Sequence, residues 1–189
     1  MVIYIILLSN VSKLICSYIN NNCEISDKDN EKINYAIIAI LSESVKFIFL
    51  FFLFFILHRL KFFIFSLIIL MSIRNFSGGL HFKTFNKCLL FSVTVFIMTS
   101  LLAPMIPRLP NLIYYFFCFI SVLIIFIKSP CTSPKRPIRN NKKKYRLKVI
   151  STISSIICLI LLVVVRNNNS LVNCGFVTIL IQAIQLILA

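Results

Sequence analysis

His81 and Cys88 are side chains whose types and spacing could support nucleophilic catalysis in this 189-residue chain. A cysteine attacks as its thiolate, and a neighbouring imidazole accepts the thiol proton and stabilises the resulting ion. The two residues are seven positions apart, which in one straight helix is about 10 Å along the axis at 1.5 Å per residue. A hydrogen bond cannot bridge that distance, so catalysis by this pair requires the chain to bend between them.

Gly78 and Gly79 supply the freedom to bend. They lie within the stretch Arg74–Cys88, RNFSGGLHFKTFNKC, a polar interruption in an apolar region. Glycine adopts backbone conformations that other residues avoid. We expect the next helix to begin near Thr84, with that residue as its N-cap. Cys88 would then lie in the first turns, where the positive end of the helix dipole favours a thiolate.

The stretch contains no carboxylate that could orient the imidazole as the aspartate of a full triad does. The sequence therefore predicts a dyad whose histidine is oriented by a backbone carbonyl, by Asn86, or by Glu43 from another helix. Three bases add positive potential: Arg74, Lys83 and Lys87. The alternative is that the histidine is an ordinary interfacial polar residue and the cysteine is inert.

Glu43 is the one acid embedded in an apolar run, residues 33–57. A position close to the membrane interface would explain it without any function. Acids inside a membrane are costly, however, and are often paired or functional. Arg74 and Lys46 are the candidate partners in that case.

Composition assigns the chain to the integral membrane proteins. Hydrophobic residues make up 59% of it, with 19 Phe and no Trp, which is more apolar surface than a soluble domain of this length can bury. The net charge of +15 is segregated: the bases cluster around 59–87 and 128–148, and all five acids precede residue 44. Basic clusters between apolar spans indicate cytoplasmic loops beside anionic lipid, so nucleic acid is not an expected partner.

The hydrophobic pattern predicts an all-α polytopic membrane protein with about four to six transmembrane helices. Residues 1–19 show helical amphipathicity and are expected to form a helix lying in the membrane interface. The expected spans are 33–57, 62–73, 89–103, 111–127, 149–165 and 175–189. The run 62–73 is short for a full crossing, so a shallow or re-entrant helix is an alternative there. Three prolines are expected to end the span 89–103.

Topology follows from the segment 128–148, which carries nine Lys or Arg and no acid. The positive-inside rule makes this segment cytoplasmic. Counting spans backwards returns Arg74–Cys88 to the cytoplasmic face as well. The N-terminus lacks the basic n-region and small-residue cleavage site of a signal peptide.

The cysteines do not suggest a metal site or a cofactor. The seven cysteines form no CxxC pair, and the chain has two histidines, so no zinc-ligand spacing is present. We therefore expect no metal and no cofactor, and we interpret the cysteines other than Cys88 as small buried hydrophobic residues.

The stretch Arg74–Cys88 resembles the signature of the AgrB (accessory gene regulator B) family of membrane cysteine endopeptidases in Gram-positive quorum sensing. Arg74, the Gly78-Gly79 turn, His81 and Cys88 stand in the family's order and spacing. The basic loop is similar to the family's proline- and lysine-rich loop, and residues 175–189 are similar to its last helix, with a glycine followed by glutamines. Cys131 departs from the pattern, in a loop position that is usually small or prolyl.

The resemblance implies a single peptidase domain over residues 1–189 that cleaves an AgrD-like autoinducing-peptide precursor on its C-terminal side. His81 would be the general base and Cys88 the nucleophile, with Arg74, Gly78, Gly79 and Glu43 in supporting roles. A cysteine or serine within the peptide would then displace Cys88 from the acyl-enzyme thioester and form a thiolactone or lactone ring. A homodimer is expected from the family alone. The competing hypothesis is a non-enzymatic membrane protein, such as a small transporter subunit or a sensor partner.

Overall fold

A computed structural model of the protein describes residues 10–12, 14–20, 26–80, 84–131 and 140–189. Within these ranges every regular element is helical. The chain forms two compact units, residues 1–53 and residues 54–189. The predicted all-α class is therefore confirmed for the described part of the chain.

The first unit contains helical residues 10–12 and 14–20 and most of α2 (Asp27–Ile56). Ser26 precedes α2, and its Oγ accepts a hydrogen bond from the backbone N–H of Asp29 at 3.3 Å, as an N-cap does. Of the amphipathic helix expected over 1–19, residues 10–12 and 14–19 are helical in the structure. Residues 1–9 and 13 lie outside the described ranges. Its interfacial position remains a prediction.

The second unit contains the end of α2 and five further α-helices. These are α3 (Leu60–Ser77), α4 (Phe85–Ile97), α5 (Asn111–Lys128), α6 (Asn141–Val164) and α7 (Asn169–Leu188). After α4 the helix continues through a π-helical turn at Met98–Leu102 and a 3-10 turn at Ala103–Met105. It ends there, among the three prolines, as the sequence predicts.

Asparagine side chains start the last two helices. Asn140 Oδ1 accepts hydrogen bonds from the backbone N–H groups of Lys142 and Lys143, at 2.9 and 3.4 Å. Asn168 Oδ1 accepts one from Leu171 N at 3.1 Å. These caps satisfy N–H groups that have no partner inside the helix. Because Asn168 caps α7, the helix begins six residues before the expected start at residue 175.

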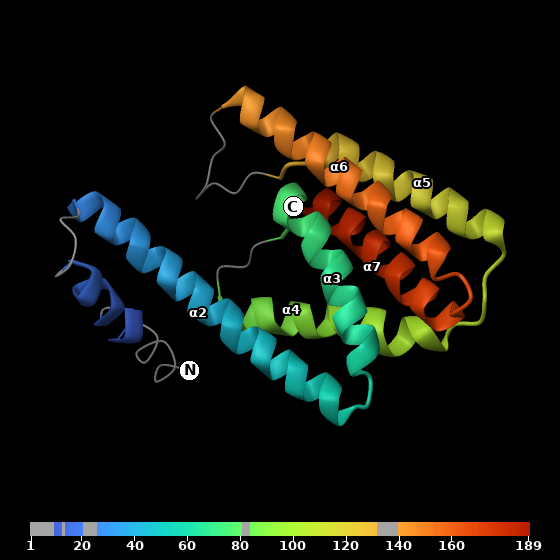
Figure 1. The fold of residues 1–189 in the computed structure, drawn as a ribbon, viewed down its shortest axis with the longest axis horizontal. Coiled ribbons are helices and arrows are strands. Elements are labelled where there is room, and N and C mark those ends of the chain that lie inside the picture. Colours follow the sequence, from blue (N-terminus) through green and yellow to red (C-terminus); the bar gives the residue numbers. More distant parts are fainter. Residues whose placement is uncertain (1–9, 13, 21–25, 81–83, 132–139) are drawn as a thin grey trace. The chain divides into compact units, whose positions relative to one another are not determined.

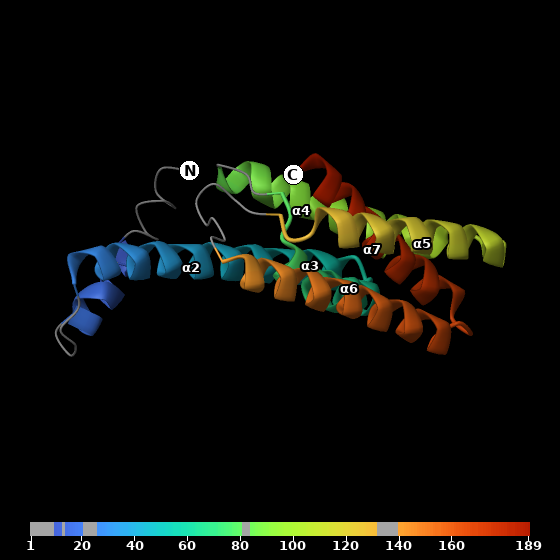
Figure 2. The same ribbon diagram turned by 90° about the horizontal axis from the view of Figure 1, so that it is seen from above.

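Helix α7 is the most enclosed part of the second unit. It contacts α3, α5 and α6 (Figure 1), and the view from above shows α5 and α6 beside it (Figure 2). In the apolar window of α7, 61% of the residues are buried, against 11% for α5. The buried apolar core around it consists of Ile69, Ile73, Ile125, Cys158, Leu162, Phe176, Ile179, Ala183 and Leu186.

Small polar side chains join the helices inside this unit. The hydroxyls of Ser66 on α3 and Thr99 lie 2.9 Å apart, and both residues are fully buried. Ser154 Oγ on α6 donates to the carbonyl of Ser72 on α3 at 2.7 Å. Small hydroxyl residues let helices approach closely in a membrane and link them by hydrogen bonds. These hydrogen bonds give specific contacts between helices in a membrane, where the hydrophobic effect does not drive helices together because lipid tails are equally apolar.

Within the described residues, six helices are long and apolar enough to cross a bilayer: α2, α3, the segment Phe85–Met105, α5, α6 and α7. The chain is therefore a polytopic membrane protein. Helix α3 is longer than the expected span 62–73. It has 18 residues, because the helix continues through Arg74 to Ser77. The shallow or re-entrant alternative rested on that short length, so a crossing helix is the simpler interpretation.

One end of the second unit gathers the elements that the sequence marks as polar. Figure 1 shows the C-terminal ends of α3 and α7 side by side. Cys131, just after α5, donates its backbone N–H to the carbonyl of Ser77 at 2.8 Å. The hydroxyl of Ser129 lies 2.7 Å from that of Ser151 on α6. The beginning of the basic segment 128–148 therefore lies against the Arg74–Cys88 stretch.

Candidate active site

The end of α3 shapes the predicted site. Gly78 follows the last helical residue, and its N–H donates to the carbonyl of Arg74 at 2.9 Å. Its φ of 78° and ψ of −158° belong to a region that residues with a Cβ rarely adopt. A Cβ placed on Gly78 would also lie 2.7 Å from the backbone oxygen of Cys131. The predicted bend at the glycines is confirmed, and both conformation and space require a glycine at this position.

Gln182 of α7 holds this turn from the inside of the helix bundle. Its Nε2 donates to Ser77 Oγ and to the carbonyl of Gly78, each at 2.9 Å. The Gln182 side chain has no solvent exposure. A carbonyl at a helix C-terminus has no partner within its helix, so a buried amide donor stabilises the turn.

Arg74 joins the last helix to the backbone just before His81. Its Nη1 donates to Oε1 of Gln185 at 3.0 Å, and its Nη2 donates to the carbonyl of Leu80 at 3.0 Å. Gly79 packs beside this pair, because a Cβ there would lie 3.5 Å from both Arg74 Nε and Gln185 Oε1. The planar guanidinium with its fixed fork of donors suits this bridging role. Arg74 therefore fixes the backbone one residue ahead of the predicted base.

The two glutamines retain unused hydrogen-bonding capacity. Gln182 Oε1 and Gln185 Nε2 are buried and have no partner among the residues that the structure describes. An amide group buried without a partner costs free energy. One acceptor and one donor at this end of α7 are thus available to groups outside the described ranges.

Cys88 lies where the sequence predicts. Helix α4 begins at Phe85, and Thr84 occupies the N-cap position with an extended backbone, at φ −119° and ψ 141°. The N–H of Cys88 donates to the carbonyl of Thr84 at 3.2 Å. Cys88 is therefore the fourth residue of α4, in its first turn, and it is half-buried. The Thr84 hydroxyl makes no side-chain capping hydrogen bond, so the cap is one of backbone conformation alone.

His81 and Lys83 lie outside the described residues, so the distance from the imidazole to the Cys88 thiol stays a prediction. Glu43 belongs to the first unit, where its side chain is 72% exposed and forms an ion pair with Lys46. Lys46 is one of the two partners that the sequence suggests. A role for Glu43 in orienting the imidazole remains a hypothesis. Over the ranges described, no three His, Cys, Asp or Glu side chains gather in a group that could hold a metal.

The glutamines of α7 belong to the candidate site, although the sequence did not point to them as site residues. From the sequence, the glycine and glutamines of the last helix were only part of the family resemblance. Their spacing offered a signal, because residues three apart lie on the same helix face, and amides are costly in an apolar span unless they have partners. Their partners, Ser77, Gly78 and Arg74, are more than 100 residues away in sequence.

Comparison with known proteins identifies the family of the chain. The family model for accessory gene regulator B matches residues 12–186. An AgrB-like protein of Clostridium beijerinckii is 38% identical over 171 residues, which cover 89% of this chain and 82% of that protein. The chain belongs to the AgrB family. A second AgrB-like protein, from Clostridium perfringens, is 28% identical over 75% of this chain and 69% of its own length. No solved structure matches the chain.

Membership in the AgrB family assigns the protein to the accessory gene regulator system of quorum sensing. It also implies an AgrD-like precursor peptide as a partner and a place in the membrane. The six membrane-length helices agree with that place. The resemblance stated from the sequence is therefore confirmed at the level of the family.

Proposed function

We propose that the protein is a membrane cysteine endopeptidase that cleaves an AgrD-like precursor on its C-terminal side, with Cys88 as nucleophile and His81 as general base. The observation that carries the proposal is the structure on either side of the histidine. Arg74 fixes the carbonyl of Leu80 immediately before it, and Cys88 stands in the first turn of α4 after it. The described residues on both sides of His81 are thus held in place, and this supports the proposed pairing of His81 with Cys88.

The first chemical step forms a thioester. His81 accepts the thiol proton of Cys88, and the thiolate attacks the carbonyl carbon of the scissile peptide bond. A tetrahedral intermediate forms, and backbone N–H groups near Gly79 or at the start of α4 are the candidate donors to its oxyanion. The carbon–nitrogen bond then breaks, and His81 returns the proton to the leaving amine. The C-terminal fragment departs, and the rest of the precursor stays bonded to Cys88.

The second step closes the ring. A cysteine thiol or serine hydroxyl within the bound peptide attacks the thioester carbonyl and loses its proton to His81. The bond to Cys88 breaks, and the cysteine regains a proton. The product is a thiolactone or a lactone. Water would compete as a nucleophile, so the step favours a site from which water is largely excluded. A half-buried cysteine at the end of a membrane helix suits that requirement.

The proposed site faces the cytoplasm. Six consecutive crossings would leave the stretch 74–88 and the segment 128–148 on the same side of the membrane. The contact between Cys131 and Ser77 supports that pairing. The segment 128–148 carries nine basic residues, and such segments stay in the cytoplasm. Its charge would also attract an acidic region of a precursor peptide.

Arg74 and Gln185 act in this proposal as positioning residues. They hold the backbone that leads into the histidine and do not touch the reacting atoms. The proposal takes the whole chain, residues 1–189, as one peptidase domain. A homodimer stays an expectation from the family.

The decisive experiment is co-expression with an AgrD-like precursor, followed by mass spectrometry of the peptide products. We expect Cys88→Ser and His81→Ala to abolish cleavage, because each removes one half of the dyad. Cys131→Ala is the matched control. It deletes a thiol beside the same turn, but the hydrogen bond of Cys131 to Ser77 comes from its backbone N–H. This control should process the precursor as the unchanged protein does.

The competing hypothesis of a transporter subunit or sensor partner predicts the opposite result. Full processing by both dyad variants, at normal membrane levels of the protein, would contradict the peptidase proposal. Membrane levels are measured by immunoblotting so that loss of folding is not mistaken for loss of chemistry.

A further inference from the structure

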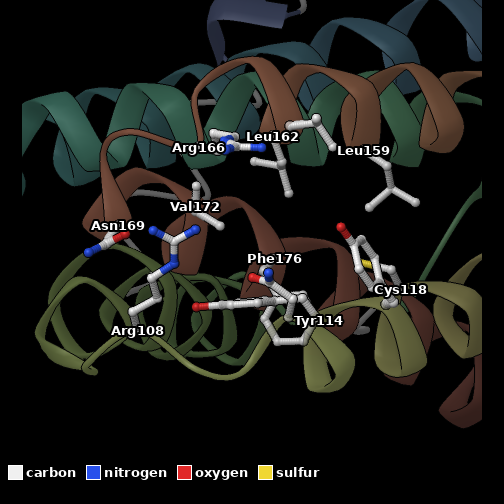
Figure 3. Close-up of a pocket in the computed structure, with 12 residues that line it drawn as sticks. Arg108, Tyr114, Cys118, Leu159, Leu162, Arg166, Asn169, Val172 and Phe176 are labelled. Carbon is white, nitrogen blue, oxygen red and sulfur yellow. The ribbon is translucent and has the colours of Figure 1, made fainter.

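A cavity of about 230 Å³ lies between α5, α6 and α7, at the end of these helices opposite to the Arg74–Cys88 stretch. It is lined by residues from the start of α5, the end of α6 and the start of α7 (Figure 3). Its polar lining includes Arg108 from the loop before α5 and Arg166 from the loop after α6. Figure 3 shows the two arginines on opposite sides of the opening.

Neither arginine is neutralised within its own unit. In the described parts of the chain, neither side chain makes an ion pair or a hydrogen bond, and both residues are exposed. No Asp or Glu follows Glu43 in the sequence, so the second unit has no acidic side chain to offer. Two guanidinium groups at one opening therefore form a site of uncompensated positive charge. An anion from outside the unit fits that charge.

The wall that carries Arg108 is held in place by hydrogen bonds. Tyr114 on α5 accepts one from the backbone N–H of Leu109 at 3.2 Å and donates one to Asn173 Oδ1 on α7. Asn173, which is 2% exposed, donates from Nδ2 to the carbonyl of Ile106 at 2.7 Å. The residues at 106 and 109 flank the arginine closely in sequence. Its backbone is thus positioned before any ligand binds, which lowers the entropy cost of binding.

The inside of the cavity is apolar. Its lining there comprises Cys118, Leu159, Leu162, Val163, Val172 and Phe176. A ligand with an anionic head and a hydrocarbon chain matches such a site, because the head reaches the arginines and the chain contacts the apolar wall. A fully polar anion would leave the apolar wall without a partner.

The position of the cavity indicates which ligand is available. It lies where three membrane-length helices begin or end. Helices that cross the bilayer would place such a position at the depth of the lipid headgroups. Tyr114 and Tyr115 line it, and tyrosine is typical of that depth. We propose that the cavity binds an anionic phospholipid, with Arg108 and Arg166 on the phosphate and the first part of an acyl chain against Leu159, Leu162 and Phe176.

Arginine is suited to phosphate because its planar donors bind two oxygens at once. The volume is somewhat below the roughly 300–1,000 Å³ of sites that enclose a drug-sized ligand. It therefore holds one part of a lipid, while the remaining chain stays in the bilayer. The site is independent of the proposed peptidase chemistry, because none of its lining residues belongs to the Arg74–Cys88 stretch.

The test uses the full chain in nanodiscs of phosphatidylcholine with increasing phosphatidylglycerol, followed by extraction and native mass spectrometry of retained lipid. We expect the unchanged protein to retain one phosphatidylglycerol molecule in preference to phosphatidylcholine. The double variant Arg108→Gln/Arg166→Gln should lose that preference by about tenfold or more, since it removes both charge-assisted contacts. Val163→Trp, which fills the cavity and keeps both charges, should reduce retention as well.

The matched control is Arg59→Gln/Lys61→Gln. It removes the same charge around the start of α3, and neither residue lines the cavity. This control should retain phosphatidylglycerol normally. Equal retention by the arginine double variant, or equal loss by the control, would overturn the proposal, because general surface charge would then explain the binding.

A final arm separates lipid from free anion. Inorganic phosphate should raise the thermal stability of the detergent-solubilised protein much less than phosphatidylglycerol does. If phosphate alone stabilises as strongly, and the effect needs both arginines, the site is one for a soluble anion and the lipid proposal is wrong.

Discussion

Gly78 shows how a single residue can set the geometry of a site. It ends α3 with a positive φ and lets the backbone at Cys131 approach to a distance that no Cβ would permit. Its neighbour Gly79 differs, because a Cβ there would meet Arg74 and Gln185 at ordinary contact distance, 3.5 Å. The two glycines are adjacent in sequence but are under different constraints.

This difference gives a paired prediction. Gly78→Ala should destabilise the turn by about 1–3 kcal/mol, because the new Cβ both strains the backbone at this positive φ and clashes with the backbone oxygen of Cys131. Precursor processing should fall with it. Gly79→Ala should process at a rate close to that of the unchanged protein. Both are measured by the precursor cleavage assay, with thermal unfolding in detergent for stability. Equal effects from the two substitutions would refute the assigned roles.

Among the elements, α7 does most to hold the second unit together. Its N-terminal half packs closely on α3 and α6 at Gly175, and its C-terminal half supplies the two buried glutamines. A Cβ on Gly175 would lie 2.3 Å from Leu162 Cδ2 and 2.9 Å from Ile69 Cδ1. The helix therefore packs closely on its neighbours through its N-terminal half and makes polar contacts to the turn after α3 through its C-terminal half.

The close packing at Gly175 can be tested by introducing side chains of increasing size at this position. Gly175→Ala should lower stability moderately, by about 1–3 kcal/mol, because the ends of the Leu162 and Ile69 side chains must shift. Gly175→Leu should lower it further, since three more carbons have no space. Ile184→Ala on the exposed side of α7 is the control and should change the melting temperature little. The measurement is thermal unfolding in one detergent, and a neutral Gly175→Leu would contradict the close contact.

At the scale of the whole molecule, the second unit has two chemically different ends. One end combines the turn after α3, the beginning of the basic segment and the end of α7. The other holds the loops 106–110 and 165–168 and the cavity with Arg108 and Arg166. The difference in basic charge between these ends is the physical basis for orientation in the membrane.

That orientation gives a labelling prediction. A membrane-impermeant maleimide should label Cys131 in inside-out vesicles and leave it unlabelled in intact cells. A cysteine introduced by Asn167→Cys, in the loop after α6, should show the reverse pattern. Mass spectrometry of tryptic peptides separates these sites from the other cysteines. Labelling of Cys131 from outside would overturn both the topology and the cytoplasmic position of the proposed site.

The sequence by itself determined the membrane class, the family and the local frame of the Arg74–Cys88 stretch. Those properties depend on local chemistry: apolar length, charge segregation, glycine at the bend, and Thr84 followed by a helix that carries Cys88. The start of a helix and a bend in the backbone depend on a few neighbouring residues, so both can be predicted from the sequence.

Only the tertiary structure decided what anchors that stretch. The sequence suggested Arg74 as a partner for Glu43, but it gave no sign of the hydrogen bonds from Arg74 to Gln185 and to the Leu80 carbonyl. Gln182 binds the turn from more than 100 residues away, and Cys131 meets Gly78 through backbone atoms. The Arg108–Arg166 cavity likewise joins two distant loops. Such pairings depend on which helices pack together, and apolar spans of similar composition carry little information about their neighbours.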